Sequence, residues 1–289
     1  MVESTRVRSK RLSFSGKKTL SSFMQVNIAS LRQSGKLRTS ETYRATLNSF
    51  MKFMDGKDVL LSNMDAELMM GYETYLKAQG ASMNTVSFYM RILRCVYRKA
   101  VGEGLALPAD PFENVYTGVD KTSKRAATLT DIKHIKQLDL SDHKSLEFAR
   151  DIFLFSFYMR GMSFIDLAYL RKSDLRDHVI TYRRRKTGRS LSVTVTPEAM
   201  AILKKYISRD DTSPYLFPLL KSGEGTKEAY REYQSALRSF NQQLMLLGEW
   251  LALNDRLSSY TARHTWATTA YHCEIHPGII SCLLYTSPS

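Results

Sequence analysis

The chain has 289 residues, a length that suggests one large or two ordinary domains, and 43% of them are hydrophobic, enough for packed cores. Its formal net charge of +14 favours a polyanionic partner, with nucleic acid ahead of an anionic membrane surface. No stretch approaches the roughly 18 apolar residues of a membrane-spanning helix, and the N-terminus has no apolar signal core. We therefore expect a soluble, cytoplasmic protein without a membrane partner.

Residues 1–19 form a basic N-terminal segment with little apolar periodicity. Two interpretations stay open for this segment: a solvated tail, or an arm that lies along phosphates. Its basic side chains belong to Arg6, Arg8, Lys10, Arg11, Lys17 and Lys18.

Residues 20–105 predict a compact helical domain, because apolar residues recur there at three- and four-residue spacing. Polar capping residues mark the expected helix starts, and Gly80 ends the second of these helices. The expected caps are Thr39 or Ser40, Asp65 and Ser82.

The helix expected over residues 82–101 carries a basic flank opposite its apolar face. No acidic residue lies between Arg91 and Lys99, so ion pairs within the helix do not explain the flank. A solvated helix face and a DNA-binding surface that contacts phosphates both remain open. The flank consists of Arg91, Arg94, Arg98 and Lys99.

Residues 106–127 combine prolines, a glycine and a basic cluster, which is typical of an interdomain linker. A second domain is expected over residues 128–281, and Thr130 is the expected cap of its first helix. An apolar helix over residues 145–159 follows. Ser163 then fits a capping box with Asp166, three residues later.

Residues 179–196 alternate apolar and polar side chains on both sides of a turn at Lys186, which predicts a β-hairpin. Further helices are expected over residues 197–207 and 230–247 and around residues 257–268. The predicted fold class is therefore mainly α with a small β-hairpin or sheet (α+β).

Three cations of the second domain lie where they suit an anionic transition state. Lys186 is at the tip of the hairpin, Arg263 is near a helix start, and Arg160 is at a helix end. A planar guanidinium binds two phosphate oxygens, and an ammonium on a flexible stem can donate a proton. Histidines 264, 272 and 276 lack partner ligands at metal-binding spacing, and no phosphate-binding glycine loop is present. We predict no metal and no cofactor.

The order of these segments resembles the tyrosine recombinases, the phage-integrase family. Residues 260–268, YTARHTWAT, are similar to the second box of the family, and residues 161–170, GMSFIDLAYL, are similar to its first box. The hairpin over residues 182–195 resembles the family's lysine-bearing hairpin. The resemblance implies a helical SAM-like core-binding domain over residues 20–105, followed by a tyrosine-recombinase catalytic domain.

The resemblance implies a site-specific recombinase or integrase of a mobile element, acting on double-stranded DNA in the bacterial cytoplasm. In this family a tyrosine attacks the scissile phosphate, which gives a 3′-phosphotyrosine, and a homotetramer exchanges strands through a Holliday junction. Arg263 matches the second catalytic arginine. Lys186 matches the hairpin lysine that protonates the leaving oxygen.

The first catalytic arginine of the family aligns with Ser163, which also suits a helix cap. Arg160, Arg184 or Arg185 is expected to supply the missing positive charge. We prefer Arg160, which lies one turn before Ser163.

The second box departs from the family at Tyr260, where the family has His or Lys. The Tyr260 hydroxyl can donate a hydrogen bond to a phosphate, but it is a poor proton shuttle near neutral pH. His264 is expected to pack beside the site. Together with Arg184, it is also a candidate DNA contact.

After Ser281 the family continues to its nucleophilic tyrosine, whereas this sequence reads CLLYTSPS. We interpret residues 282–289 as a non-native tail that resembles translated sequencing adapter. The catalytic domain is then incomplete, and the chain is expected to be inactive through truncation. Tyr285 is a poor candidate nucleophile because it comes too early. Extending the source DNA tests this interpretation.

Two other functions remain open. A non-enzymatic DNA-binding regulator or excision factor on a recombinase scaffold is favoured by the missing nucleophile and opposed by the presence of both Lys186 and Arg263. A metal-dependent nuclease is opposed by the lack of a carboxylate cluster.

Overall fold

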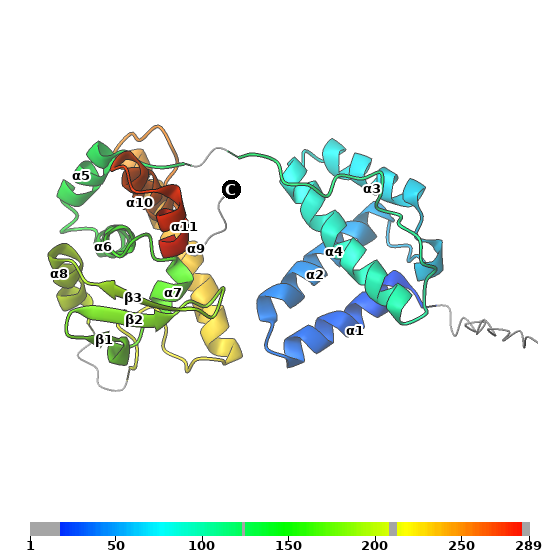
Figure 1. The fold of residues 1–289 in the computed structure, drawn as a ribbon, viewed down its shortest axis with the longest axis horizontal. Coiled ribbons are helices and arrows are strands. Elements are labelled where there is room, and N and C mark those ends of the chain that lie inside the picture. Colours follow the sequence, from blue (N-terminus) through cyan, green and yellow to red (C-terminus); the bar gives the residue numbers. More distant parts are fainter. Residues whose placement is uncertain (1–17, 123–124, 208–212, 285–289) are drawn as a thin grey trace, which may run out of the picture. The chain divides into compact units, whose positions relative to one another are not determined.

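The computed structural model describes residues 18–122, 125–207 and 213–284. The chain divides into two units, Met1–Thr122 and Ser123–Ser289 (Figure 1). The predicted basic arm up to Lys17, and also Tyr285, lie outside the described residues.

The described part of the first unit is helical. Asp65 caps α3 by accepting a hydrogen bond from the Leu68 N–H, and Ser82 caps α4 by accepting one from Thr85, so both predicted caps are confirmed. The cap predicted at Thr39 or Ser40 is wrong, because α2 begins earlier, at Leu37. The elements are α1 Leu20–Gln33, α2 Leu37–Phe53, the 3₁₀ turn η1 Leu61–Asn63, α3 Ala66–Ala78 and α4 Met83–Gly102.

The longest helix of this unit, α4, packs against α2 and α3 (Figure 1). Its apolar face is fully buried, as the sequence pattern predicts, through Val86, Met90, Leu93, Val96 and Ala100. Much of the segment with linker composition also packs here, since Ala106, Phe112 and Val115 join the same core.

The second unit combines helices with a three-stranded antiparallel sheet in the order β1-β2-β3, which confirms the predicted fold class. Its helices are α5 Leu129–Gln137, α6 Lys144–Tyr158, α7 Phe164–Ala168, α8 Pro197–Tyr206, α9 Lys227–Trp250, α10 Thr261–His272 and α11 Pro277–Leu284. The strands are β1 Leu175–Arg176, β2 Val179–Arg183 and β3 Ser190–Thr194, and the turn η2 spans Lys172–Asp174.

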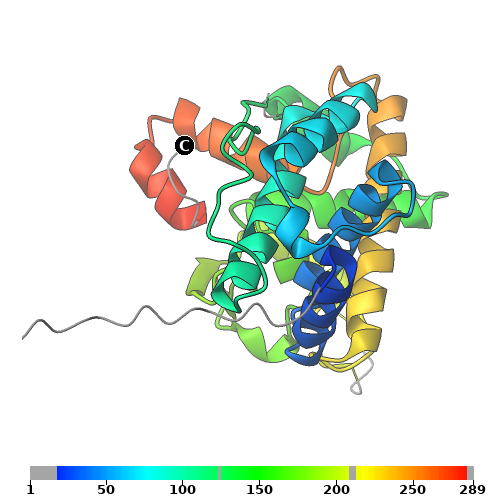
Figure 2. The ribbon, with the colours of Figure 1, turned by 90° about the vertical axis from the view of Figure 1, so that its right-hand side faces the viewer.

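Helix α6 is the centre of this unit and packs against α5, α8, α9 and α10. It is buried around most of its circumference, as expected for a helix that is apolar on nearly all sides. The helices α10 and α11 lie side by side in both views (Figures 1 and 2). No helix within the described ranges combines the length and the apolar character needed to cross a membrane.

One predicted cap of the second unit is wrong, and another has the predicted position but lacks the capping box. Helix α5 is capped by Thr128, not Thr130, because Thr128 and Asp131 form a complete capping box. Ser163 precedes α7 but makes no capping bond to the backbone. Its hydroxyl donates instead to the Asp166 carboxylate, at 2.6 Å.

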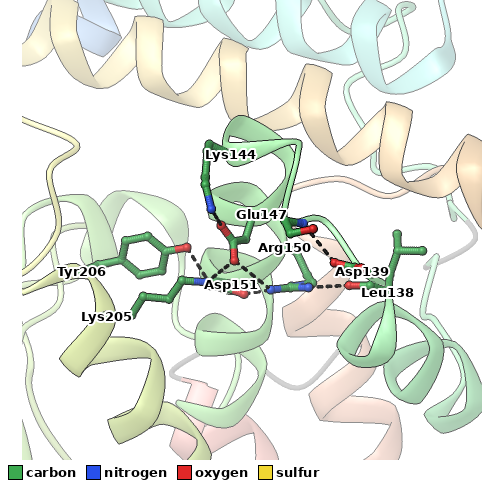
Figure 3. Close-up of polar contacts among 9 residues, drawn as sticks. Leu138, Asp139, Lys144, Glu147, Arg150, Asp151, Lys205 and Tyr206 are labelled. Carbon is green, nitrogen blue, oxygen red and sulfur yellow. Dashed lines mark hydrogen bonds and ion pairs between the residues drawn. The ribbon is translucent and has the colours of Figure 1, made fainter.

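A polar network joins α6 to the end of α8 (Figure 3). The buried Asp151 carboxylate accepts hydrogen bonds from Lys205 Nζ at 2.8 Å, the Tyr206 hydroxyl at 2.7 Å and Arg150 Nε at 2.9 Å. Glu147 accepts a second bond from Lys205, and that bond is the main reason its pKa lies below the ordinary value. The network fixes α8, and the strand before it, against the central helix.

Replacing Asp151 with asparagine is expected to destabilise the second unit by about 3 kcal/mol, because it removes one partner from a buried charged network. The matched control is Lys144→Ala, which removes an ion pair of Glu147 whose lysine side chain is 79% exposed. That change is expected to cost less than about 1 kcal/mol. Urea unfolding measures both values. Equal losses in the two variants would contradict this role for Asp151.

Candidate functional site

Arg263 lies in the first turn of α10 and is only 6% exposed. Its Nη1 donates a hydrogen bond to the Gly161 carbonyl oxygen at 2.7 Å. Its Nη2 donates to the carbonyl oxygen of Leu284, at the end of α11. The guanidinium therefore connects the loop after α6 with the end of α11, in the interior of the unit.

Arg184 follows β2 and is 3% exposed. Ile180, Tyr182 and Arg184 alternate with exposed residues, so Arg184 continues the inward face of the strand. Its Nη1 also donates to the Leu284 carbonyl oxygen, and its Nε lies 3.8 Å from Asp166 Oδ2. Two buried guanidinium groups thus converge on one oxygen.

The electrostatics of this pair favour an anion. Burial, followed by the charge of Arg184, lowers the pKa of Arg263. Asp166 offsets part of the charge through its contact with Arg184. A pocket of about 170 Å³ opens beside the two arginines and is also lined by Arg160 and Tyr182. Two guanidinium groups that face one position bind a phosphate oxygen more strongly than a neutral carbonyl oxygen.

Gly161 allows the close approach of α10 to the loop after α6. Its φ is +66°, in the left-handed region, and a Cβ atom added there would lie 2.7 Å from the Arg263 Cα. The glycine that the sequence places in the first box therefore has two physical requirements, one of conformation and one of space. Both hold the Arg263 backbone in place.

Replacing Gly161 with alanine is expected to destabilise the second unit by about 3 kcal/mol, from backbone strain and from overpacking against Arg263. Gly225 is the matched control, because its φ is +87° but nothing lies within 4 Å of an added Cβ. Gly225→Ala is expected to cost about 1 kcal/mol. Denaturant unfolding compares the two variants. Equal costs would show that the contact with Arg263 contributes nothing.

Asp166 holds the start of the turn between β2 and β3. Its buried carboxylate accepts a hydrogen bond from the Ser163 hydroxyl and, at 2.8 Å, one from the Arg185 N–H, and it faces Arg184. Ser163 therefore lies next to the arginine site but engages Asp166. Sequence reasoning assigned Asp166 only to a helix cap, and its contacts with the hairpin were missed.

Lys186 is exposed at the tip of the turn between β2 and β3. The turn is closed by hydrogen bonds from the Gly188 N–H to the Arg184 oxygen and from the Arg184 N–H to the Arg189 oxygen. Arg185 points elsewhere: its Nη1 lies 2.6 Å from Glu224, and its guanidinium stacks on the ring of Tyr169. Of Arg184 and Arg185, only Arg184 lines the pocket.

The other predicted site residues lie around this pair. Arg160 is half-buried, lines the pocket and has a φ of +57°. Tyr260 immediately precedes α10, is 44% exposed, and its ring lies 5.3 Å from the ring of His264. The second unit thus brings Arg263, Arg184 and Arg160 to one pocket.

The basic flank of α4 belongs to the first unit. Arg91, Arg98 and Lys99 are exposed, whereas Arg94 is half-buried and donates a hydrogen bond to Thr117 Oγ1 at 3.3 Å. Lys99 Nζ donates to Asn27 Oδ1 at 3.0 Å. Nowhere in the described ranges do three His, Cys, Asp or Glu side chains gather as a metal site.

The first unit matches a known domain family, and the fold of the chain is similar to solved structures. Residues 19–117 match the family model of the phage integrase SAM-like domain. No curated protein matches the chain. The fold is similar to that of a lambda integrase (75-356) dimer bound to a COC′ core site, with a TM-score of 0.69, 15% identity, and coverage of 93% of this chain and 92% of that chain.

Two further solved structures share the fold. An integrase of the Tn1549 transposon in complex with transposon right end DNA has a TM-score of 0.64 and 15% identity, over 92% of this chain and 91% of that chain. A lambda integrase tetramer bound to a Holliday junction has a TM-score of 0.66 and 14% identity, over 97% of this chain and 80% of that chain.

Proposed function

We propose that the chain is a tyrosine recombinase, a site-specific recombinase that integrates or excises a mobile DNA element. Its phage integrase SAM-like domain and its fold, which is similar to that of lambda integrase, support this proposal. The observation that carries this proposal is the convergence of buried Arg184 and Arg263 on a single oxygen. Two such groups, in a unit that also carries Lys186 at the tip of the hairpin, suit a phosphodiester whose charge grows during reaction.

In the proposed mechanism, a non-bridging oxygen of the scissile phosphate takes the place of the Leu284 carbonyl oxygen between the two arginines. A tyrosine hydroxyl attacks phosphorus and releases its proton to solvent, the bond from phosphorus to O5′ breaks, and Lys186 gives a proton to O5′. The products are a 3′-phosphotyrosine and a free 5′-hydroxyl. The reverse steps join the 5′-hydroxyl of another strand, with Lys186 removing its proton.

We assign to Arg184 the charge that the family has at the position of Ser163. Arg184 is buried and donates to the same oxygen as Arg263, whereas Arg160 lies half-buried at the pocket. A group that is already oriented loses less conformational entropy when the phosphate binds. Arg160 is the alternative that mutation distinguishes.

Double-stranded DNA is the proposed partner, and the basic flank of α4 is proposed to contact its phosphates. A homotetramer on DNA is proposed as the active assembly, on the analogy of the lambda integrase tetramer bound to a Holliday junction. The proposed location is the bacterial cytoplasm.

The proposal is tested by strand joining on a nicked DNA duplex. The sequence of the duplex is the one that the protein binds when it is offered a pool of random sequences. The nick carries a 3′-p-nitrophenyl phosphate, which imitates the phosphotyrosine, next to a 5′-hydroxyl. Since the substrate supplies the phenol, the assay reports on the phosphate site itself. We expect p-nitrophenolate release together with a joined strand. A protein that binds the duplex but joins nothing is instead a non-enzymatic DNA-binding regulator.

A further inference from the structure

Arg184 and Arg185, which follow β2, extend from the hairpin toward different partners. Arg184 reaches the pocket, and Arg185 reaches Glu224, in the loop before α9. The residue that follows them is Lys186, the proposed proton donor. The position of Lys186 therefore depends on how firmly Arg185 is held.

Arg185 is held at both its backbone and its side chain. Its N–H donates to Asp166 Oδ1 at 2.8 Å, and its Nη1 lies 2.6 Å from Glu224 Oε1. Its guanidinium carbon is 3.7 Å from the centre of the Tyr169 ring, a cation–π contact. The second oxygen of Glu224 accepts a bond from Arg171 Nη2 at 2.5 Å.

Glu224 is itself part of a fixed loop. The Glu232 carboxylate of α9 accepts hydrogen bonds from the Lys221 N–H at 2.8 Å and the Ser222 N–H at 3.0 Å. Burial raises the pKa of Glu224, but the hydrogen bonds and charges of Arg185 and Arg171 outweigh it, so the pKa lies below the ordinary value. The Glu224 carboxylate is therefore ionised at neutral pH and can accept charged hydrogen bonds from both arginines.

We propose that Glu224 is a positioning residue for Lys186, acting through Arg185. The inference rests on the proposed recombinase function, because it assigns a role in proton transfer. With Asp166 at the backbone and Glu224 at the side chain, the residue before Lys186 is fixed from two directions. Loss of one of these two contacts leaves the turn intact but lets the Lys186 ammonium move away from the O5′ position. Small misplacements of a catalytic group lower the reaction rate strongly.

A double-mutant cycle separates this role from a general structural one. Glu224→Gln keeps the shape of the side chain and removes its charge. In the p-nitrophenyl joining assay, we expect Glu224→Gln to lower the rate about tenfold while Lys186 is present. In the Lys186→Ala background we expect the same substitution to change the rate less than about twofold, since no ammonium is left to position. DNA affinity and the unfolding midpoint are expected to stay unchanged, as the Glu224 side chain is 35% exposed.

Two control variants and a pH profile make the cycle decisive. Glu228→Gln removes a charge from an exposed carboxylate four residues away and should leave the rate unchanged. Arg185→Gln breaks the same contact from its other end and should repeat the Glu224→Gln pattern, which covers a folding failure of either variant. The pH dependence of the joining rate gives a second readout. As the pH is raised, the rate of the Glu224→Gln variant should approach that of the parent protein, because hydroxide then replaces the misplaced Lys186 as the base.

Failure of the inference differs from failure of the proposed function. If the unmodified protein joins no strands, the recombinase function is wrong. If it joins strands but Glu224→Gln changes nothing, or lowers the rate by the same factor with and without Lys186, then Glu224 does not position Lys186 and only this inference falls.

Discussion

Replacing Arg184 with alanine is expected to slow strand joining about 100- to 1000-fold, the usual cost of one preorganised donor to a developing oxyanion. The same substitution at Arg160, which lies half-buried at the pocket, is expected to cost less than about tenfold. Both rates come from the p-nitrophenyl joining assay at saturating protein. Because Arg184 also faces Asp166, the unfolding midpoint of each variant is measured alongside.

Arg184→Lys sharpens this comparison, since lysine keeps the charge but not the planar fork that binds two oxygens. We expect the lysine variant to recover only a small part of the lost rate. If Arg160→Ala loses more than Arg184→Ala, then Arg160 supplies the missing charge and our assignment of Arg184 is wrong.

Arg263→Ala is expected to lower the joining rate at least about 1000-fold, because this side chain is proposed to bind the phosphate and also donates to the Gly161 oxygen. DNA affinity should change little, since it is spread over many phosphate contacts. The slope of the logarithm of the binding constant against the logarithm of salt concentration should fall by about one. The measurements are joining rates and salt titrations of binding.

One outcome for Arg263→Ala would contradict the role proposed for this residue. If affinity and rate fall by the same factor, Arg263 serves ground-state binding and not the transition state. Arg263→Lys is the matched control for charge, and its unfolding midpoint reports whether losing the bond to Gly161 disturbs α10.

Local signals in the sequence predict the hairpin and most helices well. The alternation from Ile180 to Arg184 is visible in the sequence, and in the structure Arg184 is buried on the side that continues the inward face of β2. Our preference for Arg160 depended on closeness to Ser163 along the chain. Distance along a loop says little about direction, whereas the two-residue period of a strand fixes the side to which each residue points.

Some of the failures come from tertiary contacts and others from local patterns that were misassigned. Ser163 and Asp166 have capping-box spacing, but the Asp166 carboxylate is held by the Arg185 N–H and by Arg184, so Ser163 bonds to the carboxylate and not to the helix. The Thr128–Asp131 capping box was visible in the sequence as the same pattern. Glu224 and the Leu284 oxygen reach the site from far along the chain, and no local pattern predicts that.

The most direct test of the two-arginine phosphate site is the strand-joining rate on a substrate whose scissile phosphate is replaced by a methylphosphonate, which carries no charge. If Arg184 and Arg263 act by stabilising the phosphate charge, Arg184→Ala should cost less than about tenfold on this neutral substrate, against about 100-fold or more on the phosphate. An Arg184→Ala loss of the same size on both substrates would contradict a phosphate site built from these two arginines.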